Sequence, residues 1–205
     1  MLGIVSVEQQ HSQEVDHFRR NTRLALDNSN IFLEPRTVNI QTLVLLAMHG
    51  EDYASPSLSW MLIGHACRQV EALGLHSPKQ SDFQSYQRSL CLFWFLFMID
   101  KSCALAFGRS SFLPSQLYRN VPFPDQQFLL KFRPHEVLST NNTNSPPHIS
   151  KFGGHFMTRA MELSKVLGYT WDILVLTESA ITDEHVRVQL DQWYRNTNQV
   201  CYTHM

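Results

Sequence analysis

The sequence has little of what direct nucleic-acid binding or a membrane span requires. Its 17 Lys and Arg residues are balanced by 18 Asp and Glu residues, which leaves a formal net charge of −1. No run of basic residues stands out, so direct contact with a phosphate backbone is not expected. The longest apolar run covers ten residues, 90–99, whereas a membrane-spanning helix needs about 20. We therefore expect neither nucleic acid nor a membrane as a direct partner.

Metal-binding patterns are also missing. Of the four cysteines, Cys67, Cys91 and Cys103 lie in apolar helical patterns and no Cys-x-x-Cys pair occurs, so free buried thiols in a reducing compartment are expected. The ten histidines show no His-Glu-x-x-His motif, and no metal or other cofactor is expected in this chain. We interpret His65 as a hydrogen-bonded core histidine and His76 as a partner of backbone carbonyls at a helix end.

What the chain does have is helical periodicity along most of its length, with no convincing strand. The fold class is therefore all-α, a multi-helix array of long antiparallel helices with a Pro-rich extended connection. We expect one helical domain over 1–205, with its core at 37–125, a mobile polar loop at about 133–150 and a C-terminal helical pair at 151–200. Helices are expected over residues 7–26, 38–49, 56–73, 82–107, 152–174 and 182–197.

Several helix ends carry recognisable chemistry. Gly74 stands where a left-handed residue ends a helix, and Leu75 can supply the hydrophobic contact that accompanies such an ending. Ser81 and Gln84 have the spacing of a capping box for the next helix, which Gly108 ends. The helices over 38–49 and 82–107 have nearly all-apolar centres, so both are expected to be buried on most sides.

The charges at the end of the helix over 82–107 leave two alternatives. In the first, Asp100 is buried and pairs with Arg109 or with backbone donors of the Gly108 turn, because an unpaired buried carboxylate costs several kcal/mol. In the second, Asp100 and Lys101 face water beyond the edge of the core.

An aromatic cluster in the same helix also has two interpretations. Its rings either pack in the core or line a pocket for an apolar effector. Core packing is favoured, because a ligand pocket needs convergent polar groups that the sequence does not locate. The cluster consists of Phe93, Trp94, Phe95, Phe97 and Phe107.

Three short phrases within residues 37–125 together resemble one family. They are Ala72-Leu73-Gly74-Leu75-His76, Phe93-Trp94 with Asp100-Lys101, and Gly108-Arg109-Ser110-Ser111 leading to Val121-Pro122-Phe123-Pro124. The stretch resembles the fungal-specific transcription factor domain, also called the middle homology region, which lies downstream of a binuclear zinc cluster in many fungal regulators. It departs from the pattern where Ser110 replaces a common proline and where only Arg88 remains of a basic approach to Phe93. The matching residues are Gly74, Leu75, His76, Phe93, Trp94, Asp100, Gly108, Arg109, Pro122 and Pro124.

The resemblance implies a regulatory role in the nucleus and carries over no catalytic residue. Contacts with other segments of a longer regulator, with partner proteins, with a second copy in a homodimer, or with a small apolar effector would transmit regulation. Zinc is expected only in an N-terminal module that this chain lacks, so the chain is expected to be a fragment or a shortened product of such a regulator. The alternatives are a stand-alone helical adaptor without DNA binding and, further removed, a small helical enzyme.

Overall fold

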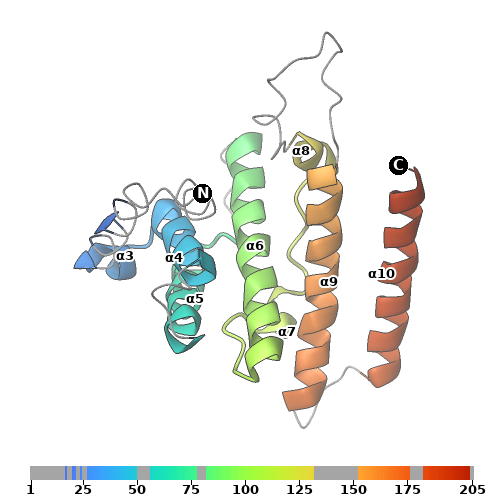
Figure 1. Ribbon diagram of the computed structural model, residues 1–205. Helices are drawn as coiled ribbons and strands as arrows, with labels where there is room; N and C mark the ends of the chain where they lie inside the picture. The colour runs from blue at the N-terminus through green and yellow to red at the C-terminus, as the bar shows by residue number, and fades with distance from the viewer. Residues whose placement is uncertain are drawn as a thin grey trace. The chain divides into compact units, whose positions relative to one another are not determined.

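The computed structural model describes residues 17, 20, 21, 24, 27–49, 56–77, 82–131, 152–175 and 182–203, and all regular structure in them is helical. The all-α class is thus confirmed. The chain divides into two compact units, Met1–Gly74 and Leu75–Met205, whose helices are coloured along the chain in Figure 1. The expected single domain stays a prediction.

Two expected segments fall wholly or mainly outside the described residues. The polar loop at 133–150 lies outside them altogether. Of the helix expected over 7–26, the structure describes only residues 17, 20, 21 and 24, which are helical.

The first unit contains three described helices, α3 (Asn30–Leu33), α4 (Thr37–His49) and α5 (Pro56–Ala72). The last two pack along one another, and α4 buries one face while Val38, Leu45 and Met48 remain 44% to 57% exposed. The expectation that this helix is buried on most sides is therefore wrong. The buried apolar residues of the two helices are Ile40, Leu43, Val44, Leu62, Ile63, Ala66, Cys67 and Val70.

Gln69 joins the short helix α3 to α5. Its side chain is only 3% exposed, and Nε2 donates to the carbonyl of Ile31 at 2.7 Å while Oε1 accepts from the backbone N–H of Arg36 at 3.4 Å. A buried amide needs such partners, so one side chain fixes both ends of the link that leads into α4.

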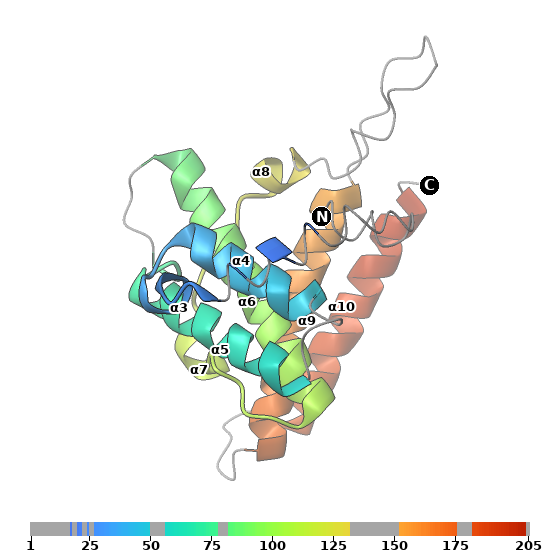
Figure 2. The same ribbon diagram turned by 60° about the vertical axis from the view of Figure 1, so that its left-hand side comes forward.

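The second unit contains α6 (Phe83–Phe107), α7 (Ser115–Tyr118), α8 (Gln126–Leu130), α9 (Phe152–Val175) and α10 (Asp183–Thr203). The three long helices stand side by side with α9 in the middle (Figures 1 and 2). While α9 and α10 are antiparallel as expected, α6 and α9 run in the same direction (Figure 1). The reason is that residues 108–125, which we call the return segment, carry the chain back along α6 to α8 before α9 begins.

The ends of α6 are well defined. Its N-cap is Asp82, whose carboxylate accepts from the N–H of Ser85 at 2.8 Å. This corrects the capping box expected from Ser81 and Gln84. At the other end Gly108 has φ 61°, and the N–H of Arg109 donates to the carbonyl of Ala104 at 3.1 Å, as expected of a left-handed glycine ending.

Candidate functional site

The ten motif residues occupy three places. Gly74, Leu75 and His76 follow the end of α5, while Phe93, Trp94 and Asp100 lie along α6. The other four, Gly108, Arg109, Pro122 and Pro124, belong to the return segment. Two contact sites join α6 to that segment, one around Asp100 and one around Trp94.

Around Asp100 a buried polar cluster holds the start of the return segment. Asp100 is 2% exposed and Lys101 is fully buried. The carboxylate accepts from the N–H groups of Phe112 and Leu113 at 2.9 and 3.0 Å and from the hydroxyl of Ser111 at 2.7 Å. Lys101 Nζ lies 3.1 Å from Asp100 Oδ2 and also donates to Ser111 Oγ and to the carbonyl of Leu113. The hydroxyl of Ser111, the N–H groups of Phe112 and Leu113 and the carbonyl of Leu113 therefore each have a charged partner on α6.

The two alternatives for Asp100 can now be separated. Asp100 is buried and paired, so the alternative in which it faces water with Lys101 is wrong. Its backbone donors, Phe112 and Leu113, lie slightly beyond the expected Gly108 turn. Nothing in the sequence indicated that Lys101 would be buried as well, since an apolar helix that ends in two charges usually ends at water.

The helix α9 also lies close to Lys101, at Gly168 and Asp172. A Cβ on Gly168 would lie 2.4 Å from Ser115 Oγ and 3.4 Å from Lys101 Cε, so α9 approaches this closely only because residue 168 is glycine. One turn further, Asp172 is 4% exposed, and burial raises the pKa of its carboxyl, with the nearby Lys101 charge acting in the opposite direction. Within the described part of the chain, Ser115 Oγ and Asp172 Oδ2 are buried without a hydrogen-bond partner.

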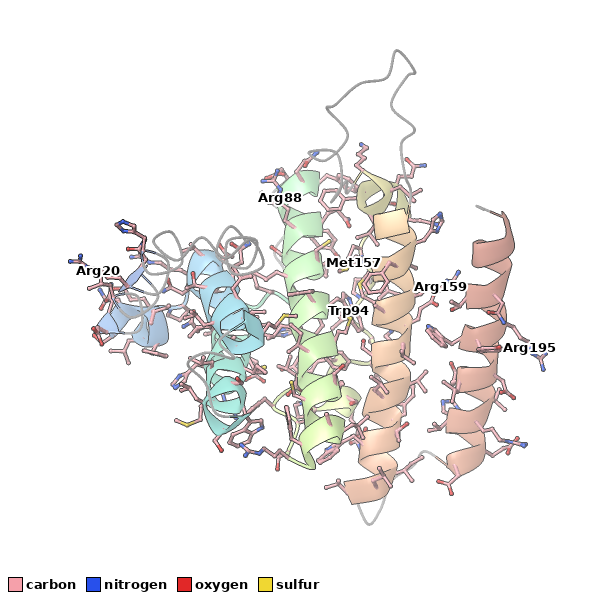
Figure 3. The ribbon with its side chains drawn as sticks, viewed as in Figure 1. Arg20, Arg88, Trp94, Met157, Arg159 and Arg195 are labelled. Atoms are coloured by element: carbon pink, nitrogen blue, oxygen red, sulfur yellow. The ribbon has the colours of Figure 1, made fainter. Side chains whose placement is uncertain are left out.

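Trp94 holds the far end of the return segment. Its indole Nε1 donates to the carbonyl of Pro122 at 2.8 Å, and its ring lies 4.6 Å from that of Phe123. The ammonium group of Lys165 on α9 lies over both rings, at 5.0 and 4.4 Å, and burial lowers the pKa of this lysine. Pro124, the residue after Phe123 along the chain, is buried, and residues 121–125 form no regular secondary structure. Figure 3 shows Trp94 on α6, on the side of α9.

The aromatic rings of α6 mostly pack together. Phe93, Trp94 and Phe97 are at most 1% exposed, and their centroids lie 5.2 to 5.9 Å apart. These three follow the core-packing alternative. By contrast, Phe95 is half-buried and Phe107 is 48% exposed.

The end of α5 combines a confirmed and a corrected expectation. Gly74 has φ 64°, and Leu75 is 6% exposed, as a left-handed helix ending predicts. His76, however, binds no backbone carbonyl among the described residues. Its ring packs against Tyr118 and Phe93 with centroids 5.3 and 6.3 Å apart, and its Nδ1 is buried without a hydrogen-bond partner in the described residues.

His65 is the other corrected histidine. It is exposed on α5 and makes an edge contact with Phe32, with ring centroids 5.1 Å apart, so it is no core histidine. Its position among the apolar residues of the helix was not enough to predict whether the ring would be buried or exposed.

Neither metal nor thiol chemistry finds support in the described ranges. They contain no group of three His, Cys, Asp or Glu side chains placed to hold a metal ion. Cys67 is a buried cysteine outside any disulfide, as expected, while Cys91 and Cys103 are only half-buried. Burial raises the pKa of Cys91 to about 11, which keeps it a poorly nucleophilic thiol at neutral pH.

Among the described helices, α6 alone is long and apolar enough to cross a membrane by length and composition. Half of its most apolar stretch is buried inside the protein, and the core helix of a globular protein passes the same test. The finding is therefore weak support for a membrane span.

Comparison with known proteins gives one family and three relatives. The family model described as "Fungal specific transcription factor domain" matches residues 1–198. A transcriptional regulator of Claviceps purpurea is 29% identical over 182 residues, which are 89% of this chain and 28% of that protein. No solved structure matches the chain.

Two further relatives carry regulatory names as well. An uncharacterized transcriptional regulatory protein of Schizosaccharomyces pombe is 29% identical over 113 residues, 52% of this chain and 17% of that protein. The nitrogen assimilation transcription factor nit-4 of Neurospora crassa is 24% identical over 157 residues, 74% of this chain and 14% of that protein. The chain thus spans less than a third of the length of each of these relatives.

Proposed function

Because the chain belongs to the family of fungal specific transcription factor domains, we propose that it regulates transcription through protein contacts and performs no catalysis. The partners are other segments of a longer regulator or separate proteins bound to it. The match of the family model over residues 1–198 carries this proposal, and the regulatory names of the relatives support it.

The use of the motif residues favours protein contacts over chemistry. Asp100 and Lys101 satisfy one another and the return segment in the core, so neither side chain is directed at a substrate. The packed rings of Phe93, Trp94 and Phe97 likewise favour a structural role over a pocket for an apolar effector. Regulatory contacts would then be made by the outer faces of the helices.

The proposal also covers the place of action and the absence of zinc from this chain. Action in the nucleus follows from a role in transcription. The net charge of −1 gives this chain no field for DNA, so a separate zinc-cluster module would supply DNA recognition. Metal analysis of the purified chain should then find no stoichiometric zinc; one zinc ion per chain would contradict this part.

A reporter assay tests the regulatory role. The chain is inserted between an unrelated DNA-binding module and an activation segment, and output is compared with the same fusion carrying an inert spacer of equal length. We expect output to differ between the two fusions at equal protein level. An output equal to that of the spacer would contradict a regulatory role and favour the adaptor alternative.

A further inference from the structure

Among the described helices, α10 packs along α9 (Figure 1). None of its described side chains is buried. The contact is made by one narrow face, whose residues are half-buried and lie three or four positions apart: Val186, Gln189, Trp193, Asn196 and Thr197. Three of these five side chains are polar. Because hydrophobic stabilisation grows with the apolar area removed from water, we expect this contact to hold α10 only weakly.

Two contacts fix how α10 lies on α9. The indole Nε1 of Trp193 donates to the carbonyl of Arg159 at 2.8 Å. The rings of His185 and Tyr169 make an edge contact with centroids 5.7 Å apart. Trp193 is half-buried and His185 is exposed, so both contacts lie within reach of water.

The closed contact also leaves a polar group unsatisfied. Arg159 lies on the side of α9 that faces α10 (Figure 3). Its guanidinium binds Glu162 at 2.7 Å, but its Nε is buried without a hydrogen-bond partner in the described residues. Burial of such a donor costs free energy, which contact with water returns when α10 moves away.

The other side of α9 is held firmly in the core. Met161 and Ser164 are fully buried, and Gly168 approaches α6 and α7 closely. At about 100° per residue these three share one side of α9, and Arg159 and Val166 lie on the opposite side. The contacts that hold α9 in the core are therefore separate from those that hold α10.

Val166 is the apolar residue of α9 that α10 covers. It is 5% exposed. It lies seven residues from Arg159 and three from Tyr169, the two residues that contact α10, and residues at these spacings share a helix face. We propose that α10 is a displaceable cover, which opens from α9 as a unit while the rest of the second unit stays folded, and so exposes Val166.

Elements with few buried apolar contacts open at a lower free energy than the core does, and α10 is such an element. A regulatory contact at the covered face of α9 would require α10 to open first. The inference concerns motion within this chain and stands whether or not the reporter assay supports regulation.

The test places one thiol under α10 and another in the core of the full chain. Val166→Cys supplies the first, which we call the cover thiol, and Met161→Cys supplies the matched control, the core thiol. Both side chains are at most 5% exposed. Labelling with N-ethylmaleimide is followed at each cysteine by peptide mass spectrometry. At low reagent concentration the rate reports the population of the open state.

A matched pair of substitutions separates opening of α10 from opening of the core. Trp193 and Trp94 each donate an indole N–H to a backbone carbonyl at 2.8 Å, on α9 and in the return segment respectively. Trp193→Phe should accelerate labelling of the cover thiol about 2- to 10-fold, the range for loss of one hydrogen bond. Trp94→Phe weakens a contact that the open form keeps, so it should accelerate the core thiol and leave the cover thiol unchanged.

We expect the cover thiol to be labelled at least about 10-fold faster than the core thiol, since opening of α10 requires less free energy than opening of the core. Circular dichroism confirms that each variant keeps its helices. Equal rates for the two thiols would overturn the proposal, because α10 would then open only with the whole unit. So would acceleration of the cover thiol by Trp94→Phe, or a cover thiol that Trp193→Phe does not accelerate.

Hydrogen exchange of the wild type checks the proposal without any added cysteine. The backbone amides of residues 189–193 should exchange at least about 10-fold faster than that of Leu96, which is fully buried on α6. Equal protection of the two helices would overturn the proposal.

Discussion

At the scale of single residues, the ion pair of Asp100 and Lys101 has the largest expected effect on stability. Replacing Asp100 with Asn leaves the buried ammonium without its carboxylate, and breaking such a pair costs about 3–5 kcal/mol. We expect a loss of that size in the free energy of unfolding, measured in urea. The matched control is Asp27→Asn at an exposed position, where a change below about 0.5 kcal/mol is expected. Equal effects of the two substitutions would contradict the buried pairing.

Replacing Asp172 with Asn should raise the stability at neutral pH, in contrast to the same replacement of Asp100, and the size of the effect should depend on pH. Burial raises the pKa of its carboxyl above the ordinary 3.8, so between the unfolded and folded pKa values the native state holds the extra proton. Stability is then full below the unfolded pKa and falls as the pH rises through the folded pKa. Asp172→Asn removes this loss.

Thermal melts across the acidic and neutral range check the expectation for Asp172. The Asn variant should melt above the wild type at pH 7, and the difference should shrink as the pH falls toward 4. A variant that melts below the wild type at every pH would mean that attraction to Lys101 outweighs the cost of burial.

At the scale of elements, α9 packs against α6 and α7 through a glycine contact. In an ordinary helix, Gly→Ala stabilises by about 0.5–1 kcal/mol. At Gly168 the new Cβ would lie 2.4 Å from Ser115 Oγ and 3.1 Å from Ser115 Cβ, so we expect a loss of about 1–3 kcal/mol from overpacking.

A double-mutant cycle identifies the contact responsible. Ser115→Ala removes the clashing hydroxyl, which has no hydrogen-bond partner among the described residues, so it should cost little alone and recover part of the loss in Gly168→Ala. Additive unfolding free energies would show that the two residues do not compete for this space.

The return segment depends on the indole of Trp94. Trp94→Phe removes the hydrogen bond to Pro122, worth about 0.5–1.5 kcal/mol. Local opening should become a few-fold more frequent, and trypsin should cleave faster after Arg119, which is exposed in this segment. Cleavage after Arg36 in the first unit is the internal control. Equal acceleration at both sites would indicate global loss of stability in place of local release.

How much of these elements the sequence predicts depends on the kind of signal. Periodicity located α4, α5, α6 and α9 to within one residue at each end and the start of α10 likewise, although α10 continues to Thr203, six residues beyond its expected end. Apolar spacing is local information, which is why it succeeds. Left-handed ends at Gly74 and Gly108 were predictable for the same reason. The parallel course of α6 and α9 was not, since it depends on how the return segment lies against α6.

At the scale of the whole molecule, the site was predictable only in part. Burial and pairing of Asp100 was one of two open alternatives. The burial of Lys101 was missed because it depends on how the return segment folds back over the end of α6, and that of Asp172 because it lies near Lys101, a residue of another helix. Gly168 carried a usable signal, since a glycine inside a long helical pattern often marks a close approach. His65 shows the converse, in that a helical stripe alone does not decide burial.

The family membership and these contacts indicate that the motif residues and the outer faces of the helices have different roles. The motif residues hold the return segment inside the second unit, which leaves regulation to the outer faces of the helices. The hydrogen bonds from Phe112 and Leu113 to Asp100 are the contacts on which this view depends most.

Hydrogen exchange at the amides of Phe112 and Leu113 therefore tests the structural role of the motif most directly. In Asp100→Asn both amides should exchange about 10- to 100-fold faster than in the wild type, as expected for the loss of a bond to a charged group. The amide of Leu96 in α6 serves as the reference for global opening. If the two amides do not accelerate beyond that reference, Asp100 is not what holds the return segment, and the motif is left available for a ligand or partner.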